Sequence, residues 1–240
     1  MSSLVRGLDG VVAVRTQLSL VDGQRGVLII RGYPVEELAG TVTFEEAAYL
    51  LWNGRLPDRS EADALDREIA ALRPIPPMTM ALVVEAAVRG VPAMDVLRMA
   101  CSTFSLDVTD ANAINHDADV ANAKMLVARL PTVVAAYIRV VAGHEPIAPR
   151  VDLPLAANFL YMTTGAEPDP VAARALEAYW VTVIDHGLNA STFTARVIAS
   201  TRSDMVSAVT GAIGALKGPL HGGAPGPVLE IGRASCRERV

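Results

Sequence analysis

The sequence is poor in cysteine, in aromatic residues and in long hydrophobic runs. Cys101 and Cys236 are its only cysteines, too few for a disulfide framework, which favours a reducing, cytoplasmic location. The first ten residues also lack the basic and apolar regions of a signal peptide. Aromatic residues make up 5% of the chain, a share typical of closely packed helices rather than of a β-sandwich. No apolar run reaches the roughly 18 residues of a membrane span, so we expect no membrane partner.

Positive charge is scarce as well. The chain has 21 Lys and Arg against 26 Asp and Glu, a net charge of −5, which disfavours nucleic acid as a partner. Apolar residues are abundant instead, at 51% of 240 residues, and charged residues make up 20%. This composition excludes a disordered chain and provides enough apolar surface for a large core.

Helical periodicity covers most of the chain. A helix predicted over residues 44–51 has a capping box made by Thr43 and Glu46, and Gly54 follows it as a stop. Further helical periods fall on residues 62–72, 78–88, 97–104, 120–141, 170–183 and 205–216. Pro131 is expected to break or kink the long one. Two apolar runs, 11–20 and 27–30, flank turn residues and predict a small hairpin. We therefore expect an all-α, multi-helix fold with a small N-terminal β-hairpin.

Two of the predicted helices have a marked apolar face. In the helix at 170–183, which Asp169 caps, the residues expected to be buried are Leu176, Tyr179, Trp180 and Val183. In the helix at 205–216, which Asp204 caps, the apolar stripe is Met205, Ala208, Val209, Ala212, Ile213 and Leu216. That stripe fits either a subunit interface or the core of the chain itself.

The last ten residues, 231–240, do not follow these patterns. They read IGRASCRERV, with three arginines and no apolar period. This string resembles a translated sequencing adapter, and we expect it to be a non-native tail. The alternative is a genuine basic C-terminal tail.

Four histidines are candidates for chemistry. His116 and His144 lie in polar surroundings and are expected at the surface. His186 lies in the segment 185–192 (DHGLNAST), and His221 lies in 217–223 (KGPLHGG). These two are 35 positions apart with no further ligand-type residues in a suitable pattern, so we expect no metal site. Either histidine is also compatible with a purely structural role in a helix connection.

The surroundings of His221 favour a catalytic role. Glycines on both sides allow a substrate to approach the backbone closely. Pro225 and Pro227 are suited to opening the next helix, whose positive end would favour a neutral imidazole. A neutral imidazole that donates a hydrogen bond to a developing oxyanion is a known catalytic arrangement.

The two histidine segments, in this order and at this separation, resemble two distinctive segments of the citrate synthase family. The stretches 31–33 (RGY), 44–51, 54–57 (GRLP) and 94–98 (MDVLR) also fit. The resemblance runs from about Leu8 to Glu230. It implies a large helical domain over residues 1–217 and the start of a smaller, mobile domain over 218–230, followed by the tail 231–240.

The resemblance implies an acyltransferase that condenses acetyl-CoA with oxaloacetate and water to give citrate and CoA, the entry to the tricarboxylic acid cycle. It implies that His221 hydrogen-bonds the thioester oxygen as the catalytic residue and that His186 binds the oxaloacetate carboxylate. No metal or cofactor is implied beyond acetyl-CoA as co-substrate. The family forms homodimers. Its second catalytic histidine, its aspartate base and its citrate-binding arginines lie beyond the position of Glu230, so we expect the 240-residue chain alone to be an inactive fragment.

Two alternatives remain open. A 2-methylcitrate synthase would use propionyl-CoA, and the difference of one methylene is worth only roughly 1–3 kcal/mol of discrimination. A non-catalytic helical scaffold relative would keep the fold without the reaction, but the presence of His221 disfavours it.

Overall fold

The computed structural model describes residues 14–108 and 115–222, and most of these residues are helical. In chain order the elements are β1 (Ser19–Asp22), β2 (Val27–Ile30), β3 (Tyr33–Pro34), α1 (Val35–Leu38), α2 (Phe44–Asn53), α3 (Arg59–Leu72), α4 (Pro77–Val88), α5 (Ala93–Thr103), the 3-10 helix η1 (Phe104–Asp107), α6 (His116–Val141), α7 (Leu155–Thr164), α8 (Pro170–Thr182), α9 (Ala190–Ser200) and α10 (Met205–Leu216). The predicted all-α fold class is confirmed. The predicted tail 231–240, and most of the predicted segment 218–230, lie outside the described residues.

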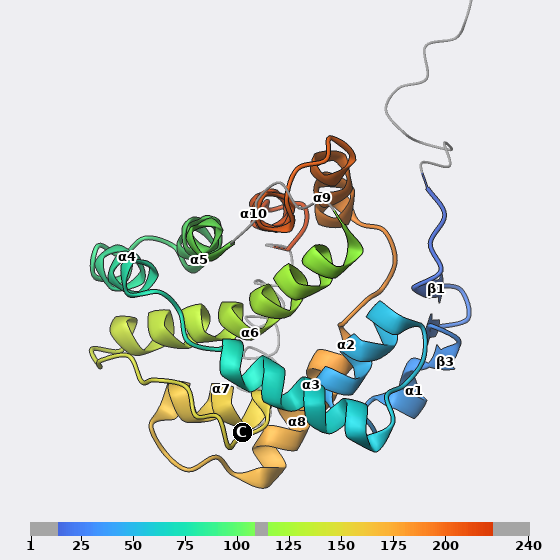
Figure 1. Ribbon diagram of the computed structural model, residues 1–240, viewed down its shortest axis with the longest axis horizontal. Helices are drawn as coiled ribbons and strands as arrows, with labels where there is room; N and C mark the ends of the chain where they lie inside the picture. The colour runs from blue at the N-terminus through green and yellow to red at the C-terminus, as the bar shows by residue number, and fades with distance from the viewer. Residues whose placement is uncertain (1–13, 109–114, 223–240) are drawn as a thin grey trace, which may run out of the picture.

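The long helix α6 lies between two groups of helices (Figure 1). Helices α4, α5 and α10 pack on it from one side, and α3 and α7 contact it from the other. Helix α9 lies beside α10, and α8 contacts α2 and α7. Of the two outcomes predicted for Pro131, a break or a kink, the break is absent, because α6 continues through this residue. The neighbouring Thr132 and Val133 are buried, and this packing offsets the hydrogen bond that the proline removes.

The sheet is small and antiparallel, with the strand order β1-β2-β3. Ser19 pairs with Ile30, and Asp22 pairs with Val27, so each of the four residues of β1 has a partner in β2. The hairpin predicted from residues 11–30 is therefore present, but its first strand begins at Ser19; residues 11–13 lie outside the described ranges. Tyr33–Pro34 adds a third strand that the sequence pattern did not predict.

Helix ends follow the predicted capping chemistry. Thr43 and Glu46 form the capping box of α2: Glu46 N donates to Thr43 Oγ1 at 3.1 Å, and Thr43 N donates to the Glu46 carboxylate at 2.8 Å. Gly54 ends the helix in the left-handed conformation. Asp169 and Asp204 cap α8 and α10 as predicted.

The main core lies between α4, α5, α6 and α10. Its fully buried side chains include Val83, Val96, Ala100, Cys101 and Phe104. Val206 and Ile213 of α10 belong to it, so the apolar stripe of α10 packs at least partly within this chain. Cys101 is a buried free thiol in this core.

The predicted buried face of α8 is partly wrong. Tyr179 is 61% exposed and Val183 is 46% exposed, whereas Val181 is fully buried. Trp180 is half-buried and makes edge-to-face contacts with Phe44 and Phe159. The helix therefore turns Val181 and Trp180, rather than Tyr179, toward its neighbours.

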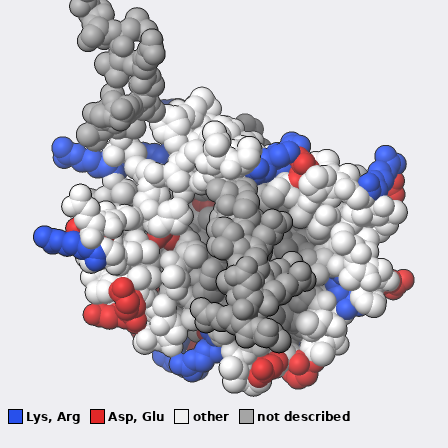
Figure 2. Space-filling model, turned by 180° about the vertical axis from the view of Figure 1, so that it is seen from behind, with Lys and Arg blue, Asp and Glu red and all other residues white. Residues whose placement is uncertain are grey.

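Charged side chains of both signs are interspersed around the rim of the face seen in Figure 2. Within the described residues, no single helix is long and apolar enough to cross a membrane; α3 and α4 pass such a test only as a pair bent by 66°, by length and composition alone.

Candidate active site

The segment that carries His186 connects α8 to α9 and is fixed by its neighbours. The Asp185 carboxylate accepts a hydrogen bond from Ser19 Oγ of β1 and another from Gly187 N at 3.0 Å. These bonds tie the segment to the N-terminal sheet. His186 itself is exposed, so its imidazole is accessible from solvent.

Asn189 ends this segment and begins α9. Its side-chain Oδ1 accepts the Thr192 backbone N–H at 2.9 Å, which makes it the N-cap of α9. The same oxygen lies 2.7 Å from Ser191 Oγ, which donates to it. Ser191 is thereby placed in the first turn of α9 with a defined side-chain direction.

His221 lies in a turn that follows α10. Its backbone N–H donates to Gly218 O at 3.0 Å, and Gly222 N donates to Leu216 O at 2.9 Å. A Cβ at Gly222 would lie 2.5 Å from the same Leu216 carbonyl oxygen. The turn therefore closes against the end of α10 only with glycine at this position.

The fold brings the two histidine segments together through Ser191. The distance between His221 Nε2 and Ser191 Oγ is 3.0 Å. The serine has one hydroxyl proton, so two arrangements exclude each other: it donates to Asn189 Oδ1 and accepts from Nε2–H, or it gives up the bond to Asn189 and donates to Nε2. The second arrangement places the proton of a neutral imidazole on Nδ1, where it is free to be donated to a substrate oxygen.

Helices α9 and α10 pack closely enough for this contact. A Cβ on Gly211 of α10 would overlap Cδ1 of Ile198 of α9. The absent side chain at Gly211 leaves room for Ile198 between the two helices.

The sequence predicts no role for Ser191, although this residue lies in the segment 185–192 that carries His186. The signal that was available is local: an asparagine N-cap two residues before a serine directs that serine into the first turn of a helix. Its partner His221 is 30 positions away, and only the packing of α9 on α10 reveals that contact.

The other two histidines are exposed, as predicted. His116 is the first residue of α6, and His144 follows its C-terminal end. No group of three His, Cys, Asp or Glu side chains suited to hold a metal ion occurs within the described residues.

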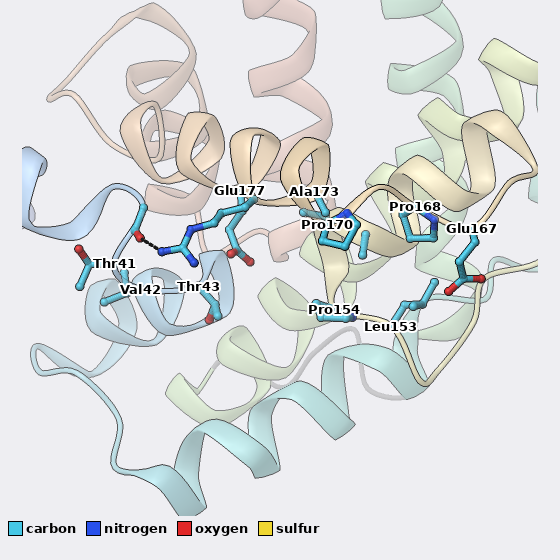
Figure 3. Close-up of a pocket in the computed structure, with 14 residues that line it drawn as sticks. Thr41, Val42, Thr43, Leu153, Pro154, Glu167, Pro168, Pro170, Ala173 and Glu177 are labelled. Carbon is cyan, nitrogen blue, oxygen red and sulfur yellow. Dashed lines mark hydrogen bonds between the residues drawn. The ribbon is translucent and has the colours of Figure 1, made fainter.

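Two hollows of the described structure are lined by other residues than His186 and His221. One, of about 560 Å³, lies between residues 40–43, the start of α7 and the start of α8, where Arg174 Nη2 donates to Gly40 O at 2.9 Å (Figure 3). Glu177 points into this hollow, and partial burial raises the pKa of its carboxyl. The other, of about 450 Å³, is apolar and is lined by Trp52 and Trp180 among others.

Comparisons with known proteins show to which family the chain is related. The family model for the citrate synthase C-terminal domain matches residues 7–236, a range that includes the first residues of the predicted tail. The chain is 42% identical over 236 residues to citrate synthase of Haloferax volcanii, covering 95% of this chain and 61% of the relative. It is 43% identical over 238 residues to 2-methylcitrate synthase of Mycobacterium tuberculosis, covering 97% of this chain and 60% of the relative.

Solved structures give the same result. Citrate synthase of Pyrobaculum aerophilum matches with a TM-score of 0.80 and 39% identity, over 89% of this chain and 55% of that one. Citrate synthase of Thermoplasma acidophilum, solved as a ternary complex with carboxymethyl coenzyme A and oxaloacetate, matches with a TM-score of 0.82 and 28% identity, over 91% of this chain and 58% of that one. The chain thus spans about 60% of the length of the curated relatives it matches. With the family model matching nearly its whole length, the chain belongs to the citrate synthase family.

Proposed function

We propose that the protein condenses acetyl-CoA with oxaloacetate and water to give citrate and CoA. The observation that carries the proposal is the 3.0 Å contact between His221 Nε2 and Ser191 Oγ, which joins the two histidine segments. The Thermoplasma acidophilum relative, whose structure contains carboxymethyl coenzyme A and oxaloacetate, supports these substrates.

In this proposal His221 donates a hydrogen bond to the thioester oxygen. Removing a proton from the methyl group next to a thioester builds negative charge on that oxygen. A fixed neutral donor stabilises this enolate-like state more than it stabilises the bound substrate, and therefore accelerates the step. This step requires the Ser191 hydroxyl to turn from Asn189 Oδ1 and donate to His221 Nε2, which leaves the proton of the neutral imidazole on Nδ1 for the substrate.

We assign His186 to the oxaloacetate carboxylate. The imidazole is exposed at the segment that Asp185 ties to the sheet. An imidazole N–H donates to a carboxylate oxygen, and the fixed backbone around it lowers the entropy cost of that contact.

The reaction is proposed for a protein that includes the family's remaining length. The resemblance places the aspartate base, a second histidine and the citrate-binding arginines in that remainder, so we propose that the 240 residues alone do not condense the substrates. We also propose that no metal or further cofactor takes part; an excess of EDTA is expected to leave the rate of the full-length gene product unchanged.

The test is release of free CoA from acetyl-CoA and oxaloacetate by the full-length gene product. His221→Ala is expected to lower kcat by roughly 10²- to 10³-fold, the usual effect of losing one oxyanion donor. His186→Ala is expected to raise the KM for oxaloacetate. His144→Ala, which removes an exposed histidine after α6, is the matched control and should leave both constants unchanged. A His221→Ala protein with unaltered kcat would refute the mechanism.

A second candidate is 2-methylcitrate synthase, because a relative of that name is as similar to the chain as the citrate synthases are. The decisive measurement is the ratio of kcat/KM for propionyl-CoA and acetyl-CoA. A ratio above one would replace the first candidate with the second. A protein that binds neither acyl-CoA nor oxaloacetate would instead be a non-catalytic scaffold relative.

We further propose a homodimer in the cytoplasm. Large apolar side chains are exposed on α4 and α6, two helices that pack on each other: Met78, Val88, Ile138 and Val141. Such side chains are suited to an interface between copies of the protein. Light scattering of the full-length product tests the dimer, and fractionation of source cells tests the location.

A further inference from the structure

The end of α10 is joined to the start of α5 by an ion pair. Lys217 Nζ donates to Asp95 Oδ1 at 2.5 Å, across 122 positions of sequence. Arg98 Nη2, one turn further along α5, lies 3.6 Å from the same carboxylate oxygen. Lys217 is the C-cap of α10, and Asp95 lies in the first turn of α5.

Both charges lie at the helix end that favours them. The N-terminus of α5 has a partial positive charge that stabilises the carboxylate, and the C-terminus of α10 has a partial negative charge that stabilises the ammonium group. The hydrogen bond from Lys217 also lowers the pKa of the Asp95 carboxyl. The pair is therefore formed at neutral pH.

Lys217 directly precedes the turn of residues 218–222 and lies four positions before His221. The turn of residues 218–222 has little packing of its own, since Leu220 is 99% exposed. The turn is held by the bond from Gly222 N to Leu216 O at the end of α10, by the bond from His221 N to Gly218 O within the turn, and by the contact of His221 with Ser191. Fixing Lys217 on α5 thus fixes the point from which the turn starts.

The energetics favour a local role for the pair. The side chains of Lys217 and Asp95 are 41% and 23% exposed, and ion pairs this accessible add little to global stability. A small displacement of a catalytic group, in contrast, lowers the rate strongly. Loss of the pair should therefore affect the position of His221 far more than the folding of the protein.

We propose that Asp95 and Lys217 are positioning residues that hold the turn carrying His221 in its catalytic place. The inference rests on the proposed function. It adds that the turn carrying His221 is anchored on α5 through Lys217 and Asp95, in addition to the contact that His221 makes with Ser191 of α9.

The test is a double-mutant cycle in the full-length gene product with Asp95→Asn, Lys217→Met and the double variant. Each is expected to lower kcat by about tenfold, with the KM for oxaloacetate and the Tm nearly unchanged. The double variant should be no worse than either single variant, because both remove the same contact. Asp95→Glu keeps the carboxylate and should restore most of the rate.

Glu85→Gln is the matched control. It breaks an exposed ion pair with Arg89 on α4, whose N···O distance is 2.6 Å, and it should leave kcat unchanged. Amide hydrogen exchange over residues 217–222 gives a readout that does not depend on activity. Exchange should be faster in Asp95→Asn and Lys217→Met than in the wild type or in Glu85→Gln.

Unchanged exchange over 217–222 in both single variants, or additive losses of kcat in the double variant, would overturn the inference. If the wild-type protein does not condense the substrates at all, the proposed function fails and the catalytic part of the inference fails with it. The exchange measurement then still decides whether the pair anchors the turn.

Discussion

Ser191 is the residue through which the two halves of the candidate site meet. Its hydroxyl lies 2.7 Å from Asn189 Oδ1 and 3.0 Å from His221 Nε2. The asparagine oxygen is an acceptor only and also accepts the Thr192 N–H, so it takes the serine proton whenever the hydroxyl does not donate to the imidazole. The serine is thereby held between a fixed acceptor and the imidazole, and it limits how far the ring can rotate.

Ser191→Ala is therefore expected to lower kcat by about tenfold while leaving the free energy of unfolding within about 2 kcal/mol of the wild type, since the two part-buried hydrogen bonds with Asn189 and His221 are lost. Ser200→Ala is the matched control: it removes a serine at the other end of α9 whose hydroxyl donates to Val197 O. CoA release and urea unfolding measure the two effects. An equal loss of rate in both variants would contradict a specific role for Ser191.

At this scale the sequence selects His186 and His221 as candidates, but it does not predict the contact between His221 and Ser191. The glycine-containing segments around His186 and His221 distinguish these two from His116 and His144. These surroundings are local and can be read along the chain. The contact with Ser191 depends on the relative placement of α9 and α10, which no local pattern encodes.

At the scale of elements, α10 and the turn after it form one unit. The helix packs its buried face, which includes Val206 and Ile213, into the main core, and the turn closes back on Leu216. Gly222 lies close to the backbone of α10, so that a Cβ at this position would collide with the Leu216 carbonyl oxygen. A backbone oxygen within a helix end cannot move aside as a side chain can.

Gly222→Ala is expected to displace the turn and to lower kcat by at least about tenfold, because the neighbouring His221 moves with it. Gly211→Ala is the informative comparison. Its Cβ would meet only the flexible end of Ile198, which can rotate away, so a modest loss of stability of about 1 kcal/mol and a smaller loss of rate are expected. Steady-state kinetics of both variants measure the loss of kcat, and thermal unfolding measures the loss of stability. A larger loss of rate in Gly211→Ala would contradict the assignment.

Element positions follow from the sequence where caps and stops are local. The capping box of α2 and the aspartate caps of α8 and α10 are predicted and observed. The faces of helices are less predictable: periodicity alone places Tyr179 in the core, whereas it is 61% exposed. The neighbours of α8, rather than its own pattern, decide which of its apolar residues are covered.

At the scale of the whole molecule, buried polar residues join segments that are far apart in sequence. Arg73, at the end of α3, is 1% exposed and donates to Arg150 O and Leu153 O, each at 2.7 Å. Glu45 of α2 is 3% exposed. Its Oε1 accepts a hydrogen bond at 3.1 Å from the backbone N–H of Leu155, the first residue of α7. Both side chains hold the segment that leads into α7. The sequence does not predict either role, because charged residues on α2 and α3 read as solvated ones.

Glu45 should make stability depend on pH. Burial is the main reason that the pKa of its carboxyl rises from 4.5 to about 7, and the negative charges of Asp66 and Glu177 contribute to the rise. Hydrogen bonds from the backbone of Glu45 and from Leu155 N lower the pKa, but by less. The folded protein therefore binds a proton more tightly than the unfolded chain. The contribution of Glu45 to the free energy of unfolding is therefore largest below pH 4.5 and falls as the pH rises toward 7. Above pH 7 the protein is roughly 3 kcal/mol less stable than below pH 4.5, as far as this group is concerned.

Glu45→Gln removes this titration and keeps an oxygen that can accept from Leu155 N. Any cost of burying the amide is the same at every pH. The stability of the variant relative to the wild type should therefore improve by up to roughly 3 kcal/mol between pH 5 and pH 8, as measured by urea unfolding of the full-length product. Glu37→Gln, which removes an exposed carboxylate on α1, corrects for the general change in charge. A difference between Glu45→Gln and the wild type that stays constant across this range would mean that Glu45 is ionised at all of these pH values, with its charge compensated by the nearby guanidinium of Arg73.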